Sequence, residues 1–237
     1  MAIWHRTLAV SGLGAALLIG GCQRQEPVQT QAAPGGTVDH SLLTKVLEQY
    51  VNEDGMVDYR GLRENRGDLD AYLELLAGTD PESLRSRDEK LAYWINAYNA
   101  TTLQYVLDEY PLASVKDVNK GGKDFWHSRE FTLGGREYLI DAIENEVIRP
   151  RFEEPRIHFV LVCAAMGCPR LEAHAFTGQD LEQRLETATR RFVNNPGKNR
   201  VDVAGGKLHL SSIFKWYAPD FEKAAGSVKA YVRGYLD

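Results

Sequence analysis

The spacing of apolar residues predicts helices joined by short hairpins. Apolar positions recur every three to four residues over 39–51, where Leu43, Val46, Leu47 and Tyr50 would share one face. The same period predicts helices over 65–77, 87–109, 179–194 and 228–235, a short helix capped by Asp141 and ending near Pro150, and a short aromatic helix over 211–217. Alternating apolar residues around paired glycines predict hairpins over 128–140 and 200–210.

One short apolar run stands apart from the helical pattern. Residues 159–162 are aromatic or aliphatic without a helical period, which predicts a buried central strand. Small residues and Gly167 follow, and Cys168 then precedes Pro169, a residue suited to a turn or to the first position of a helix. Helices and hairpins are clustered rather than alternating, so we expect an α+β fold. In this fold the helices of a single domain, residues 39–237, pack around the hairpins and the central strand.

The N-terminal segment predicts export and anchoring. Residues 1–21 contain an apolar run over 8–19 that is too short to span a bilayer and is typical of a signal peptide. The ending at residues 18–22 resembles a bacterial lipobox, so Cys22 is expected to carry acyl chains such as palmitate. Residues 22–38 would form a disordered tether. Gln23 beside the anchor favours an outer-membrane lipoprotein facing the periplasm; the alternatives are secretion or inner-membrane anchoring.

Composition and charge narrow the expected partners. The 237 residues are 43% hydrophobic and 26% charged, which is ordinary for a globular protein with one core. The net charge is −5, and lysines and arginines are interspersed with acidic residues. This pattern argues against nucleic-acid binding. The expected partners are the membrane, through the lipid anchor, and a cell-envelope substrate or protein.

Four ordered sequence blocks carry a resemblance to a known family. They are residues 93–99, 139–145, 156–163 with Cys168-Pro169, and 214–217 with Asp220-Phe221. Together, over residues 45–235, they resemble the domain of unknown function 547, a family without an established activity. The resemblance implies that a shared pattern includes Asn96, Glu144, His158, Cys163 and Cys168. At Asn145 the sequence departs from the family, in which histidine usually follows the glutamate.

The first functional hypothesis is a cysteine-dependent enzyme of the acyl-transfer or hydrolase type. Cys168 would be the nucleophile, activated by a helix N-terminus and by His158 as the base. Glu144 or Asn96 would orient the imidazole ring. Trp94, Asn99 and Arg156 are the candidate ligand-binding residues, and no cofactor is expected.

The second hypothesis is a non-catalytic domain that binds a ligand or partner. In an oxidising compartment, Cys163 and Cys168 could instead form a structural disulfide. Asn96 and Asn99 lie three residues apart on one helical face, where they could either anchor a crossing loop or orient a ligand. A metal site is not expected, because the spacing of His158, Cys163 and Cys168 lacks the close ligand pairs of ordinary zinc sites.

Overall fold

The computed structural model describes residues 36–165, 167–202 and 204–237. The predicted signal peptide, the lipidation site Cys22 and most of the predicted tether lie outside these residues. Within the described part of the chain, no helix is both long enough and apolar enough to cross a membrane.

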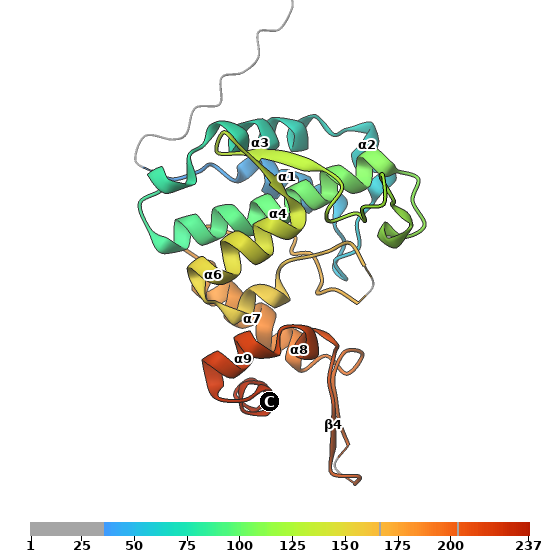
Figure 1. Cartoon of the computed structure of the whole chain (residues 1–237), viewed down its shortest axis with the longest axis vertical. Coiled ribbons are helices and arrows are strands. Elements are labelled where there is room, and N and C mark those ends of the chain that lie inside the picture. The colour runs from blue at the N-terminus through green and yellow to red at the C-terminus, as the bar shows by residue number, and fades with distance from the viewer. Residues whose placement is uncertain (1–35, 166, 203) are drawn as a thin grey trace, which may run out of the picture.

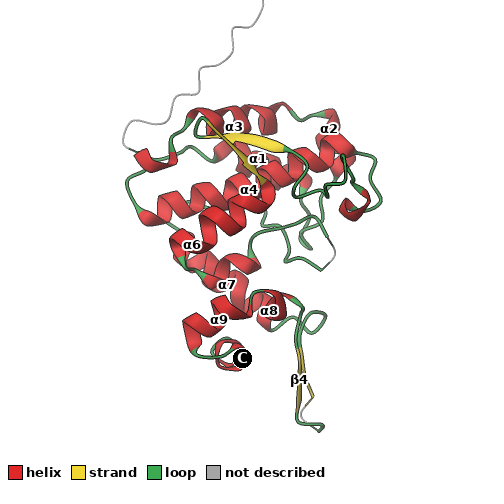
Figure 2. Ribbon diagram, in the orientation of Figure 1, coloured by secondary structure: helices red, strands yellow, loops and turns green. Residues whose placement is uncertain are grey.

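The described elements are mostly helices, with two short hairpins (Figures 1 and 2). In chain order they are α1 (Ser41–Tyr50), α2 (Tyr59–Glu64), α3 (Gly67–Gly78), η1 (Pro81–Ser83), α4 (Arg87–Glu109), η2 (Val115–Asp117), β1 (Glu130–Leu133), β2 (Arg136–Leu139), α5 (Ile140–Ala142), the π-helical segment η3 (Ile143–Ile148), α6 (Arg149–Phe152), η4 (Pro155–Phe159), α7 (Leu181–Val193), β3 (Arg200–Asp202), β4 (Lys207–His209), α8 (Ile213–Trp216), α9 (Ala218–Ala225) and α10 (Val228–Arg233).

Helix α4 is the centre of the molecule. It starts where the Ser86 hydroxyl accepts a hydrogen bond from the Glu89 backbone N–H, and it is buried on nearly all sides. Helices α1 to α3 and the first hairpin lie on one side of α4, and α6 and α7 lie on the other (Figure 1). Helices α8 to α10 pack around Phe159 and Phe221 as a second apolar cluster at the far end.

Both hairpins are antiparallel and two-stranded. In the first, Glu130 pairs with Leu139 and Leu133 with Arg136; in the second, Val201 pairs with Leu208. The first hairpin packs on α3, whereas the second projects away from the body of the molecule (Figure 2). These features confirm the predicted α+β class.

The predicted central strand is wrong. Residues 155–159 form the 3-10 helix η4, and the chain then continues without regular structure. The reason is that Val160 and Val162 bond to the side chain of Asn99 rather than to a neighbouring strand. Of the two structures that Cys168-Pro169 allowed, a turn or a helix start, the described residues show a turn, and those that follow Pro169 are irregular up to α7.

Two helix boundaries also differ from the prediction. The helix predicted over 65–77 is α3, which begins two residues later, at Gly67. It is preceded by the short helix α2, which was not among the predicted helices and which Asp58 caps by accepting from the Gly61 N–H. Asp141 lies inside α5 rather than capping it. The chain stays helical past Pro150, which has no N–H to donate, and the π-helical segment Ile143–Ile148 directly precedes this region.

Candidate functional site

A cavity lies beside the loop that carries the two cysteines. Its volume is about 650 Å³, within the usual range for small-molecule sites. Residues of α4, α7, the turn over 53–57 and the segment 162–171 line it. The Gly55 backbone adopts φ +77°, and a Cβ there would lie 2.5 Å from the Cβ of Arg170, so glycine lets the turn pack closely on the cysteine-bearing segment.

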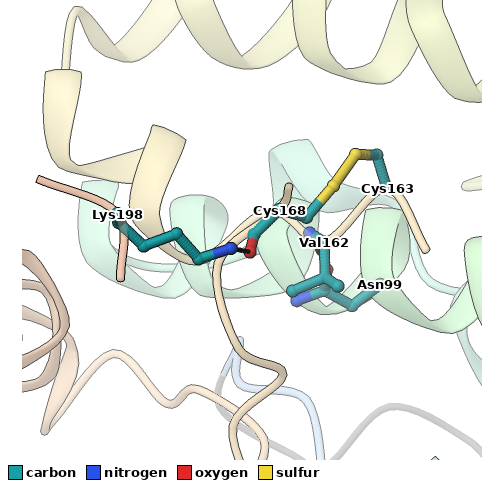
Figure 3. The surroundings of a disulfide bond; sticks show 5 residues. All are labelled: Asn99, Val162, Cys163, Cys168 and Lys198. Atoms are coloured by element: carbon teal, nitrogen blue, oxygen red, sulfur yellow. Dashed lines mark hydrogen bonds between the residues drawn. A yellow bond between two sulfur atoms is a disulfide. The ribbon is translucent and has the colours of Figure 1, made fainter. Parts of the chain in front are cut away.

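Cys163 and Cys168 are joined by a disulfide, with their Cα atoms 6.1 Å apart (Figure 3). Cys168 borders the cavity, and its carbonyl oxygen accepts a hydrogen bond of 3.1 Å from the Lys198 ammonium (Figure 3). Neither sulfur is a thiolate while the bond is intact, so the nucleophile hypothesis would first require reduction. The sequence analysis left open whether these two cysteines are paired, and in the structure they are.

Asn99 fixes the chain as it enters the cysteine loop. Its amide nitrogen donates to the Val160 carbonyl at 3.0 Å, and its amide oxygen accepts from the Val162 N–H at 2.9 Å. Figure 3 shows the asparagine directly beside Val162. This paired contact satisfies the buried backbone as a neighbouring strand would. Asn99 also lines the cavity.

Asn96 makes the equivalent pair of bonds one helical turn earlier. It donates to the Phe176 carbonyl at 2.8 Å and accepts from the Phe176 N–H at 2.9 Å. Both amide groups are therefore occupied by main chain. Of the two roles that the sequence allowed, this geometry is that of a loop anchor.

The loop closed by the disulfide contains backbone strain. Ala164 adopts φ +56°, in the left-handed region that non-glycine residues rarely occupy. Such a conformation costs about 1–2 kcal/mol. The Asn99 contact to Val162 and the disulfide at Cys163 hold the chain immediately before Ala164.

His158 lies in a separate, buried polar cluster. The residue is 3% exposed, and its ring stacks on Tyr217 with centroids 3.7 Å apart. Its Nε2 lies 2.7 Å from Asp220 Oδ2. Its Nδ1 lies 3.6 Å from Glu144 Oε1 and makes no hydrogen bond within the described structure.

The Asp220 carboxylate is the central group of this cluster. Arg149 donates to both of its carboxylate oxygens, at 2.8 and 3.0 Å. Burial alone would raise the pKa of Asp220, but the hydrogen bonds from His158 and Arg149 outweigh burial and lower that pKa below its ordinary value. Burial, followed by the nearby Glu144 carboxylate, raises the pKa of the Tyr98 and Tyr217 hydroxyls. The cluster is thus centred on the Asp220 carboxylate, which both Arg149 and His158 contact, while Nδ1 of His158 stays without a hydrogen bond within the described structure.

The structure does not bring Cys168 and His158 together. Phe159 lines the cavity with Cys168, whereas the preceding side chain, His158, is enclosed by Glu144, Tyr217, Asp220 and Phe221. Sequence reasoning paired His158 with Glu144 but assigned no role to Asp220 or Arg149. Asp220 could have been found from the sequence, because it belongs to the Asp220-Phe221 block that carries part of the family resemblance.

Trp94 and Arg156, the other two predicted ligand-binding residues, make contacts within the protein that stabilise the fold. Trp94 is 1% exposed and packs edge-on against Tyr93 and Tyr138. Arg156 bridges Glu154 and Glu182, and the hydrogen bonds to these carboxylates raise its pKa. Neither residue lines the cavity. Among the described residues, no group of three His, Cys, Asp or Glu side chains could hold a metal ion.

Comparison with known proteins assigns the family. No curated protein and no solved structure matches the chain. Residues 81–193 match the family described as "Protein of unknown function, DUF547". This span contains α4 with both anchoring asparagines, the π-helical segment with Glu144, and the segment from His158 to Cys168. Residues 81–193 of this chain belong to the DUF547 family.

Proposed function

We propose that this protein is a lipid-anchored cell-envelope domain that binds a small ligand in the cavity beside the Cys163–Cys168 loop. The observation that carries the proposal is that the disulfide-bonded loop borders a cavity of about 650 Å³. The apolar residues that line this cavity include Val57, Leu103, Val106 and Leu112. A mostly apolar hollow with a few polar groups is the usual form of a small-molecule site.

The geometry favours binding over thiol catalysis. A hydrolase of the kind suggested by the sequence needs a free Cys168 thiol within hydrogen-bond reach of its base. Here the sulfur is bonded to Cys163, and the Nε2 of His158 faces Asp220 at 2.7 Å. Catalysis would therefore require both reduction and rearrangement of the segment between the two residues.

The redox state of Cys163 and Cys168 distinguishes the proposed ligand-binding function from thiol catalysis. We expect the protein isolated from cells without reductant to show no thiol by titration after denaturation, and two thiols after reduction. We expect these thiol counts because Cys22 would be acylated and the other two cysteines would be paired. A freely titrating Cys168 that reacts quickly with an alkylating reagent would instead favour the enzyme.

The anchor is tested separately. Cells grown with labelled palmitate should yield a labelled protein in the membrane fraction, because acyl chains on Cys22 supply the membrane affinity. Cys22→Ser should abolish both the label and the membrane association. Retention of the variant in the membrane fraction would contradict the proposed anchor.

A further inference from the structure

Two residues that line the cavity each have a buried hydrogen-bond donor without a partner in the described part of the chain. Thr102 on α4 is 3% exposed, lines the cavity, and its hydroxyl makes no hydrogen bond within the described structure. The adjacent Thr101 hydroxyl, in contrast, donates to the Ala97 carbonyl at 2.8 Å. Arg170 also lines the cavity, and its buried Nε makes no hydrogen bond within the described residues. Buried polar groups are nearly always hydrogen-bonded, so unpaired donors at one cavity indicate a missing acceptor.

Arg170, which is partly buried, forms no ion pair among the described residues. In contrast, Arg191, a second arginine that lines the cavity, pairs with Glu172. Lys198 is engaged with the Cys168 carbonyl. The acidic lining residues, Glu53 and Asp54, are exposed, so solvent screens their charge more than that of a buried group.

We propose that the ligand of this cavity is a carboxylate with an apolar body; this inference rests on the proposed binding function. The carboxylate would accept hydrogen bonds from Arg170 and Thr102, and the apolar body would contact Leu103, Val106 and Phe159. Arginine suits this role because its planar fork of donors matches the two oxygens of a carboxylate.

The test compares probes that differ only in the head group. The full chain in lipid nanodiscs is titrated calorimetrically with decanoate, decanol and acetate, and the signal of empty nanodiscs is subtracted. Decanoate should bind at least about tenfold more tightly than decanol, because a charge-assisted hydrogen bond is lost with the alcohol. Acetate should bind weakly, because it lacks the apolar body.

Two variants test the assigned residues. Arg170→Gln should weaken decanoate binding about tenfold and leave decanol binding unchanged. Thr102→Val should weaken decanoate binding several-fold, and it keeps the inference testable if the arginine variant does not fold. Arg60→Gln is the matched control, since it removes the same charge from an exposed position outside the cavity.

The outcomes distinguish this inference from the proposed function. Equal affinities for decanoate and decanol, unchanged in Arg170→Gln, would overturn the carboxylate assignment but leave a binding cavity. Absence of binding by all three probes would count against both. Loss of decanoate affinity in Arg60→Gln equal to that in Arg170→Gln would show a general charge effect and overturn the assignment.

Discussion

Thr101 and Thr102 are neighbours on α4 with opposite hydrogen-bonding situations. The Thr101 hydroxyl donates within the helix to Ala97, and the Thr102 hydroxyl makes no hydrogen bond although its residue is buried. An unpaired buried hydroxyl costs free energy, whereas a paired one contributes a net stabilisation of about 1 kcal/mol. At the scale of single residues, this contrast supports the proposal that α4 borders a ligand site as well as the core.

This contrast predicts different effects on stability. Thr102→Val should leave the free energy of unfolding unchanged or raise it, because no hydrogen bond is lost and an unpaired polar group is removed. Thr101→Val should lower it by about 1 kcal/mol. Urea denaturation of both variants measures the difference. Equal destabilisation by the two substitutions would mean that the Thr102 hydroxyl has a partner in solution.

The sequence could identify the important residues but not the direction of their side chains. His158 and Cys168 were both singled out, and so was the segment that carries them. Whether they meet depends on how each side chain packs, and in the structure His158 contacts Asp220 whereas Cys168 is bonded to Cys163 and borders the cavity. Packing against α8 and α9 decides this, and those helices lie more than 50 residues further along the chain.

At the scale of elements, α4 shows which predictions succeed. Its predicted limits, 87–109, agree with the structure, because local signals set both ends: a serine cap at the start and Pro111 soon after the end. The central strand failed for the opposite reason. An apolar run at 159–162 resembles a strand, but its bonding partner is a side chain of α4 about 60 residues away.

Asn99 should therefore behave as a structural tie between α4 and the cysteine loop. Asn99→Ala leaves the Val160 carbonyl and the Val162 N–H without their partner, and each lost buried partner costs about 1–3 kcal/mol. Together, the two lost partners should lower the free energy of unfolding by roughly 2–6 kcal/mol. Chemical denaturation measures it.

Gln104→Ala is the control on the same helix, since Gln104 is only partly buried. It should change stability by less than about 0.5 kcal/mol. A loss in Asn99→Ala no larger than in this control would show that water or rearranged backbone replaces the side chain, and that the loop does not depend on α4.

At the scale of the whole molecule, a buried histidine links stability to pH. His40 precedes α1, is 5% exposed, and its Nδ1 lies 2.7 Å from the Tyr72 hydroxyl of α3. Its Nε2 is buried without a partner, so a proton there could not be solvated. Burial lowers the pKa of His40 from 6.5 to about 4.

This shift predicts a loss of stability on mild acidification. The unfolded chain takes up a proton below pH 6.5, whereas the folded chain does so only near pH 4, so the stability is fully present above pH 6.5 and falls between these values. The shift corresponds to roughly 3 kcal/mol. Urea denaturation at a series of pH values measures the slope, which His40→Asn should flatten. His209→Asn, on the exposed strand β4, is the matched control. An unchanged slope in His40→Asn would refute the assignment.

The π-helical segment Ile143–Ile148 lets the helix hold an additional residue while Arg149 still meets Asp220. A π turn needs about one residue more than an α turn to complete the same full rotation. Removing one residue here would let the turn become α-helical and would leave Arg149 facing Asp220, whereas the same deletion within a regular α-helix would rotate every later side chain by about 100°. Relatives that share the Arg149–Asp220 pair should therefore tolerate a one-residue difference in length at this turn.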